Sequence, residues 1–232
     1  MLVAAGSRRW LPYLGPHRTV GGLSAATVAP TLRPMFAVIF EVEPKPERWD
    51  DYLRHATSLR PALLAIDGFI DNRRYNSRRH PGRLLSLSLW RDEKSVIRWR
   101  THGGHHAVQT AGRQAVFRDY HLRVGEVIRD NAAPLNRARL DATEVGSAQF
   151  VSLIDAPVLG APDGARGWDM FDGITIPGST LLLISWVDRG AMERWSRPSG
   201  ERRLDLEIVR DYGLTDRREA PQFHAPVGLP NG

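Results

Sequence analysis

The sequence contains an internal repeat, and this repeat limits the possible folds of the chain more than any other feature. Six positions recur at a constant offset of 96 residues, so that Tyr75, Pro81, Gly82, Trp90, Asp92 and Trp99 return as Phe171, Pro177, Gly178, Trp186, Asp188 and Trp195. A later segment, Val127–Asp130, returns as Ile208–Asp211 at an offset of 81. The two offsets differ by 15 residues, which predicts two copies of one unit with the second copy trimmed.

The pattern of apolar residues in the first copy predicts four strands and two helical segments. The predicted elements are a strand at Phe36–Val42, a helix at Glu47–Ile66 that Pro61 kinks or ends early, strands at Phe69–Asn76 and Arg83–Arg91 around a turn at His80–Gly82, a helical stretch from Asp92 to Phe117 interrupted at Gly103-Gly104, and a strand at Tyr120–Ile128. The order βαββαβ builds a four-stranded antiparallel sheet with both helices on one face. The predicted fold class is therefore α+β, with two fused ferredoxin-like units.

Composition shifts along the chain set the predicted domain boundaries. Residues 1–34 contain no acidic residue and no sustained period, which indicates a disordered or over-annotated extension. The first unit is predicted at 35–130 and the trimmed unit at 147–214, with a linker at 131–146 and a Pro-rich tail at 215–232.

Composition also excludes several classes of site. The chain has no Cys, which removes disulfides, thiolate nucleophiles, iron–sulfur clusters and Cys-built zinc sites. It has no apolar run long enough to span a membrane, and the cytoplasm is the default compartment.

The net charge of +6 does not by itself predict a nucleic-acid partner, because the cations are scattered along the chain. One dense basic cluster comprises Arg73, Arg74, Arg78, Arg79, His80 and Arg83. The cluster is either a solvated strand pair and turn or a rim that binds phosphate or an acidic ligand.

Several segments carry a family resemblance. They are Ile66–Phe69, the strand Leu84–Trp90, the run Trp90–Glu93, the nine-residue step from Trp90 to Trp99, and the His- and Gln-containing helix that follows. Together they resemble the antibiotic biosynthesis monooxygenase family over about residues 35–130, and Phe171–Trp195 resembles it more faintly. The resemblance implies an α+β barrel of two sheets around a pocket, which the two copies would form within one chain. It also implies a possible homodimer of that chain.

Two branches of this family imply different chemistry. Haem-degrading members carry an axial His after the second Trp and an Asn on the first strand. This chain has Gln109 ten residues after Trp99 and no Asn in Phe36–Val42, so a haem enzyme would need His106 instead. The other branch oxidises phenolic or anthrone-like polyketides without metal or prosthetic group. The resemblance implies a monooxygenase of this second kind, with a haem protein and a non-catalytic ligand-binding or stress-response protein as alternatives.

Five side chains share one face of a continuous helix at steps of three and four residues: Trp99, His102, His106, Gln109 and Arg113. We predict that His106 or His102 is the general base, because a neutral imidazole accepts a proton near pH 7. Arg113 would stabilise an enolate or phenolate, and Gln109 would orient the substrate. His105 points elsewhere on the helix, so the histidines cannot converge on one metal ion. The alternative is a polar stripe that faces solvent.

The strands predict one pocket per chain. Ser86 and Ser88 share one face of their strand, whereas the matching positions of the second copy are Leu182 and Ile184. Small polar side chains leave room for a ligand, and large aliphatic ones fill space. The residues predicted to contact a flat, mostly apolar aromatic ligand are Trp99, Gln109, Ser86, Ser88, Tyr75, Asn72 and Arg123.

Overall fold

A computed structural model describes residues 35–131, 150–155, 163–195 and 201–221. The first half contains β1 (Phe36–Pro44), a 3-10 turn (Pro46–Arg48), α1 (Trp49–Ser58), α2 (Arg60–Leu64), β2 (Phe69–Ser77), β3 (Leu84–Trp90), α3 (Glu93–Thr101), α4 (Gly103–Ala111), a π-helical turn (Gly112–Val116) and β4 (Phe117–Asp130). The second half contains β5 (Phe150–Asp155), β6 (Ala165–Gly173), β7 (Thr180–Trp186), α5 (Arg189–Arg194) and β8 (Arg203–Gly213). The predicted extension at 1–34 lies outside the described residues, as do nearly all of the linker and the end of the tail.

The eight strands close into one barrel in the order β1-β3-β2-β6-β7-β5-β8-β4, and every pair is antiparallel. The strand order is β4-β1-β3-β2 in the first half and β8-β5-β7-β6 in the second, so both halves have the same topology. The halves join where β2 pairs with β6 and where β4 pairs with β8. The predicted α+β barrel of two ferredoxin-like units is confirmed.

The helical segments differ from their prediction in continuity. The helix predicted at Glu47–Ile66 breaks at Leu59, and Pro61 lies in the first turn of α2, where a missing N–H costs nothing. The helical stretch after Asp92 is also two helices, because His102 has an extended conformation (φ −62°, ψ 123°) between α3 and α4. The continuous helix predicted to carry the polar stripe is therefore wrong, and the stripe bends at His102.

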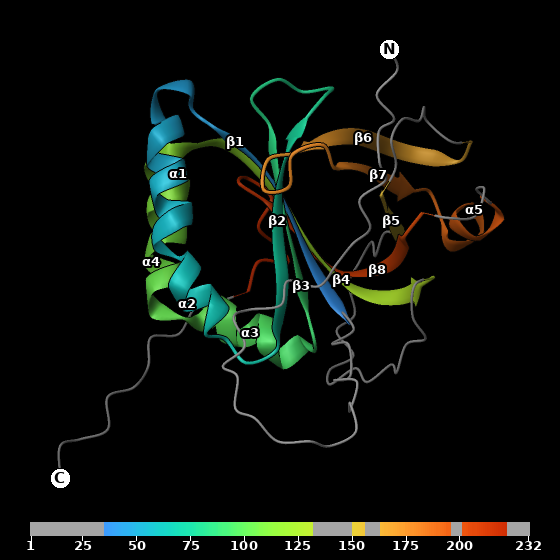
Figure 1. Ribbon diagram of the computed structural model, residues 1–232, viewed down its shortest axis with the longest axis horizontal. Coiled ribbons are helices and arrows are strands. Elements are labelled where there is room, and N and C mark those ends of the chain that lie inside the picture. Colours follow the sequence, from blue (N-terminus) through green and yellow to red (C-terminus); the bar gives the residue numbers. More distant parts are fainter. Residues whose placement is uncertain (1–34, 132–149, 156–162, 196–200, 222–232) are drawn as a thin grey trace, which may run out of the picture. The chain divides into compact units, whose positions relative to one another are not determined.

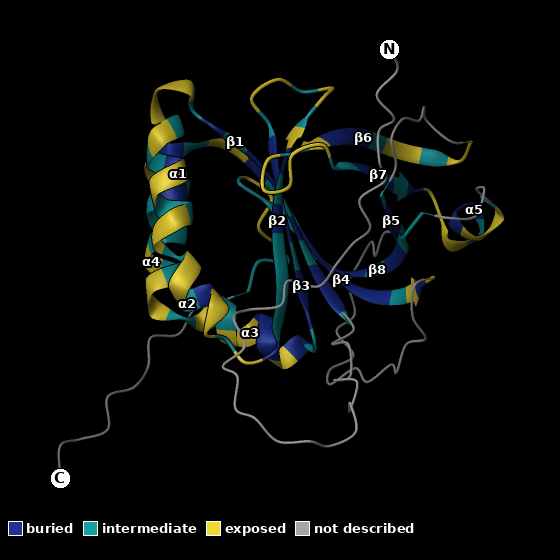
Figure 2. Cartoon of the chain, viewed as in Figure 1, coloured by how far each residue is buried: buried dark blue, intermediate teal, exposed yellow. Residues whose placement is uncertain are grey.

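Strand alternation separates two cores. Phe36, Val38, Phe40 and Val42 pack with residues of the helices, whereas Ala37 and Ile39 are fully buried on the opposite face, inside the barrel. Figure 1 shows α1 to α4 together over one side of the barrel, with the short α5 beside the second half. In Figure 2 the strands are mostly buried and the helices expose their outer faces.

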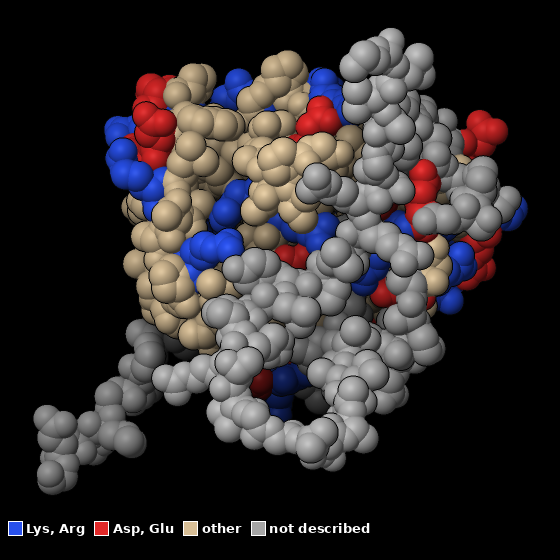
Figure 3. Space-filling model, in the orientation of Figure 1, with Lys and Arg blue, Asp and Glu red and all other residues tan. Residues whose placement is uncertain are grey.

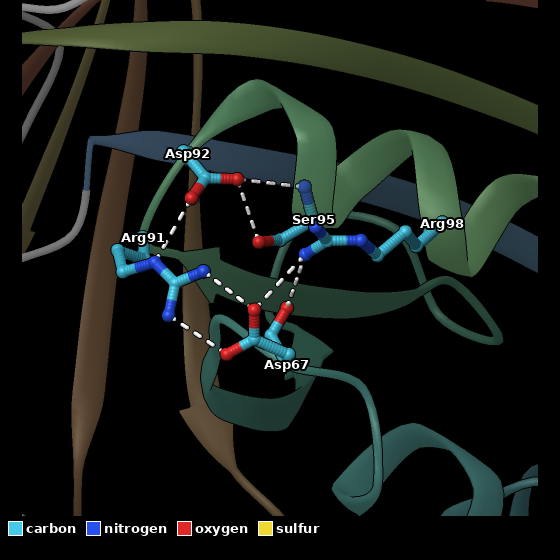
Figure 4. A network of polar contacts seen from close by, with 5 residues as sticks. All are labelled: Asp67, Arg91, Asp92, Ser95 and Arg98. Atoms are coloured by element: carbon cyan, nitrogen blue, oxygen red, sulfur yellow. Dashed lines mark hydrogen bonds and ion pairs between the residues drawn. The ribbon is translucent and has the colours of Figure 1, made fainter.

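One polar network connects the turn before β2 to the start of α3 (Figure 4). The Arg91 guanidinium donates two hydrogen bonds of 2.8 Å to the Asp67 carboxylate, and Arg98 adds a third of 3.1 Å. Asp92 caps α3 by accepting from the backbone N–H of Ser95 at 2.8 Å. Gly68 has φ +87°, and a Cβ there would lie 1.9 Å from the Ser95 hydroxyl oxygen, so only glycine fits this turn.

Candidate functional site

A pocket of about 330 Å³ lies between the helices of the first half and the outer face of its sheet. Its apolar walls are formed by Phe40, Leu59, Leu63, Val108 and Leu122. The volume is at the lower end of the range of about 300–1,000 Å³ that is common for small-molecule sites. The pocket therefore suits a compact ligand with a mostly apolar body.

The sheet floor of the pocket carries polar groups from β2 and β3. The Asn72 amide donates to the Ser86 hydroxyl at 3.0 Å, and the Trp90 indole N–H donates to the Ser88 hydroxyl at 2.9 Å. Arg74 lines the same floor and lies directly opposite Ser86 in the strand register. Each serine hydroxyl accepts one bond and keeps its own proton available for a ligand.

The helical roof carries two adjacent histidines in different environments. The His105 ring stacks on Trp99 with 4.2 Å between ring centroids, and its Nδ1 lies 2.9 Å from the Trp99 carbonyl oxygen. Because a carbonyl only accepts, Nδ1 carries the proton and Nε2 is an acceptor. Burial lowers the pKa of His105 to about 4, so this ring is neutral near pH 7. His106, Gln109 and Arg113 also line the pocket.

Charge in the pocket lining has one sign. Among the residues that the structure describes, the lining includes no aspartate or glutamate and these five arginines: Arg60, Arg74, Arg100, Arg113 and Arg217. Burial lowers the pKa of Arg100, and the neighbouring Arg210 acts in the same direction. Burial raises the pKa of Tyr212 to about 12, and Tyr120 acts in the same direction. The pocket therefore offers cations and a neutral phenol.

The comparisons with known proteins agree with this architecture. The model of the family described as antibiotic biosynthesis monooxygenase matches residues 35–111. A protein of Pyricularia oryzae named jasmonate monooxygenase ABM is 45% identical over 217 residues, which cover 83% of this chain and all of that protein. The chain belongs to the antibiotic biosynthesis monooxygenase family. It is thus a monooxygenase, an oxidoreductase.

Solved structures with low sequence identity are also similar to this family member. An anthrone oxidase-like protein is 14% identical with a TM-score of 0.35, covering 82% of this chain and 98% of its own. A conserved protein from Methanosarcina mazei Go1 is 20% identical with a TM-score of 0.37, covering 39% of this chain and 90% of its own. No described helix of this monooxygenase has both the length and the apolar character needed to span a membrane.

Seven of the residues predicted for the site line the pocket of this monooxygenase: His106, Arg113, Trp99, Gln109, Ser86, Ser88 and Asn72. His102 is not among the lining residues, because its Nδ1 accepts from the His105 N–H at 3.4 Å and caps α4. Tyr75 and Arg123 do not line it either, since both are buried on the other face of the sheet. The structure therefore corrects the predicted position of these three side chains.

Sequence reasoning missed several lining residues, and the most distant ones come from the second half. Tyr212 of β8 opposes Leu122 of β4, and Arg217 and Pro221 follow β8 into the pocket wall. Arg217 donates to the Tyr120 hydroxyl. Residues 215–221, predicted as the start of a tail, therefore contribute to the site. Only the β4–β8 pairing of a closed barrel indicates this contribution.

In the described part of the second half, side chains fill the matching positions. Leu182 and Ile184 are fully buried in a cluster with Met170, Trp186 and Met192, and Trp168 packs against it. Trp168 and Met170 oppose Ile184 and Leu182 in the same register in which Asn72 and Arg74 oppose Ser88 and Ser86. Side chains thus fill the second half where the first half has a polar floor.

Proposed function

We propose that this monooxygenase oxidises a small, mostly apolar substrate with an activated CH₂ group, without a dedicated redox cofactor. The observation that carries the proposal is the helix-covered pocket, in which apolar walls face a polar floor and a roof with His106, Gln109 and Arg113. A flat aromatic or polyketide-like molecule provides such a CH₂ group between conjugated rings.

The proposed reaction balances with the substrate as the reductant. His106 takes a proton from the CH₂ group, and Arg113 stabilises the resulting enolate or phenolate. The carbanion passes electrons to O₂ and a C–O bond forms, which gives a peroxide that takes back the proton held by His106. The O–O bond and the remaining C–H bond then break, so that the ketone forms and the second oxygen leaves as water with both protons. The net change is R₂CH₂ + O₂ → R₂C=O + H₂O.

Jasmonate is a second candidate substrate, because the relative that covers most of this chain is named for it. Hydroxylation of an unactivated carbon follows RH + O₂ + 2e⁻ + 2H⁺ → ROH + H₂O. This reaction requires a two-electron donor, such as a reduced nicotinamide or flavin. The need for an added reductant therefore separates the two substrate classes.

The test is oxygen uptake by the purified protein with anthrone, and separately with jasmonic acid, each with and without reduced nicotinamide and flavin. We expect anthrone to be oxidised without reductant, with one O₂ consumed for each ketone formed. We expect His106→Ala to lower kcat by about 100-fold or more while the melting temperature stays unchanged. Unchanged turnover in the variant would exclude His106 as the base.

Haem is the remaining cofactor alternative, with His106 as its axial ligand. A haem titration followed by absorbance tests it directly. A saturable Soret band at one haem per chain, lost in His106→Ala, would replace the cofactor-free reaction. Absence of the band leaves that reaction in place.

A further inference from the structure

The dense basic cluster of the β2–β3 hairpin is divided by the fold. Most of its members have partners: Arg73 pairs with Asp71, Arg78 with Asp172 and Arg83 with Glu43, while Arg79 lies over the Trp168 ring. On the face in Figure 3, basic side chains are interspersed with acidic and uncharged ones. Arg74 is the member of the cluster that lines the pocket.

Arg74 is anchored in the pocket floor without a countercharge. Its side chain is hydrogen-bonded to the neutral Tyr52, no ion pair with an acidic residue is recorded for it among the described residues, and its Nε is buried without a hydrogen-bond partner among them. A buried donor without a partner is unfavourable, so an anionic acceptor placed at the Arg74 guanidinium is stabilised. Among the described residues that line the pocket, none is an Asp or Glu that could take that place.

A second donor lies beside Arg74. Ser86 is its cross-strand neighbour, and neighbours in register have Cβ atoms about 4.5–5.5 Å apart. The Ser86 oxygen accepts from Asn72 at 3.0 Å, so its hydroxyl proton is free to be donated. A guanidinium and a hydroxyl at this separation can bind the two oxygens of one carboxylate.

Arg74 and Ser86 lie in the first half, which contains the pocket, and the second half has apolar residues at the equivalent positions. At the matching register positions of the second half, Met170 opposes Leu182, and both are buried in an apolar cluster. The same strand pairing therefore forms without an arginine at this position. The arginine occurs where there is a pocket and is replaced by methionine where there is none.

We propose that Arg74 and Ser86 form a carboxylate-binding subsite, so that the substrate is a small amphipathic carboxylic acid. The carboxylate lies on the sheet floor, and the apolar body extends between Leu59, Leu63 and Val108 towards the histidines of α4. This inference rests on the proposed function for the identity of the pocket as the substrate site. The inference adds a fixed orientation of the substrate within the pocket.

The test measures binding of matched acid and ester probes by tryptophan fluorescence. The probes are jasmonic acid with methyl jasmonate, and 1-naphthoic acid with methyl 1-naphthoate. We expect the wild type to bind each acid at least about tenfold more tightly than its ester. Arg74→Met should remove that preference and leave ester binding unchanged, whereas Arg74→Lys should retain part of it.

Two control variants locate the effect. Arg78→Met removes a cation that is paired with Asp172 outside the pocket, and it should bind the acids like the wild type. Arg100→Met removes another pocket cation and should have a smaller effect than Arg74→Met. Equal binding of acid and ester by the wild type, or an acid preference lost in Arg100→Met but kept in Arg74→Met, would overturn the subsite.

The outcomes separate this inference from the proposed function. Oxygen uptake with neutral anthrone and no acid preference would retain the reaction and refute the subsite. An acid preference that depends on Arg74, without any substrate-dependent oxygen uptake, would retain the subsite and refute the reaction.

Discussion

At the scale of single residues, the two adjacent histidines of α4 lie in distinct chemical environments. The His105 ring is fixed by its bond to the Trp99 carbonyl oxygen and by stacking on the Trp99 ring. A pKa of about 4 makes it a weak base, so it suits hydrogen-bond acceptance rather than proton abstraction. His106 lines the same pocket and remains the proposed base.

The buried neutral state of His105 predicts a pH-dependent stability. Its ordinary pKa is 6.5 and burial lowers it to about 4, so the unfolded chain binds more protons between these values. Protonation therefore favours the unfolded state as pH falls from about 6.5 to about 4. We expect the free energy of unfolding of the wild type, relative to His105→Gln, to fall by about 1–3 kcal/mol over this range.

The test uses the difference in unfolding free energy between the wild type and His105→Gln, because other groups titrate in the same pH range. Burial raises the pKa of Asp155 to about 7, which favours the folded state as pH falls and so acts in the opposite direction. Such effects cancel between wild type and variant. Urea unfolding from pH 7 to pH 4.5 measures the difference, and parallel stability curves would contradict the assignment.

At the scale of elements, two equivalent strand pairs differ in what they carry. The β2–β3 pair forms the polar floor of the pocket in the first half, and the β6–β7 pair forms part of a filled core in the second. Ser86 and Ser88 of β3 line the pocket, while Leu182 and Ile184 of β7 are fully buried. The backbone register is the same in both pairs, so the side chains alone decide whether space remains.

Exchanging side chains between the halves tests this difference. Ser88→Leu fills the pocket and leaves the Trp90 indole N–H without its acceptor, so ligand affinity should fall by about tenfold or more. Ile184→Ser creates a cavity in the second half and should cost about 2–4 kcal/mol of stability with a change in Kd below about twofold. Fluorescence titration and thermal unfolding measure both quantities. Equal effects on Kd would show that the halves are not functionally distinct.

At the scale of the whole barrel, a buried polar network connects the two halves. Arg123 of β4 donates to Glu41 of β1 at 2.7 Å and to Ser185 of β7 at 2.7 Å. Although burial raises the pKa of Glu41, hydrogen bonding to His121 and the charge of Arg123 lower it to about 2. Glu41 is therefore charged inside the barrel and depends on these partners.

Removing Arg123 should leave the Glu41 charge without its buried cation, with His121 still hydrogen-bonded to it. We expect Arg123→Met to destabilise the protein by about 3–5 kcal/mol, and the double variant with Glu41→Gln to recover a large part of this loss. The exposed pair of Arg78 and Asp172 also joins the halves, and Arg78→Met should cost below about 1 kcal/mol. Denaturant unfolding compares the three proteins. A loss of stability in Arg123→Met no larger than in Arg78→Met would contradict this role.

The predicted positions of the strand residues agree with the structure where local periodicity was sufficient. The alternation places Ser86 and Ser88 on one face of their strand, and the structure shows that this face, with Asn72 of the neighbouring strand, lines the pocket. Arg123 failed because alternation separates two faces without showing which one the helices cover. The predicted position of His102 is wrong because the helix is not continuous from Trp99 to Arg113: His102 has an extended conformation between α3 and α4, and it caps α4.

The sequence by itself determined the two units, the order of their elements along the chain and the contrast between the polar floor and the filled one, because these follow from local periodicity, from the internal repeat and from residues of one hairpin. Only the tertiary structure decided that the floor faces the helices and that Tyr212 and Arg217 complete the pocket from the second half. These features depend on the closure of the barrel by β4 and β8. Closure pairs strands that are far apart in the sequence, so no local pattern shows which side chains it brings together.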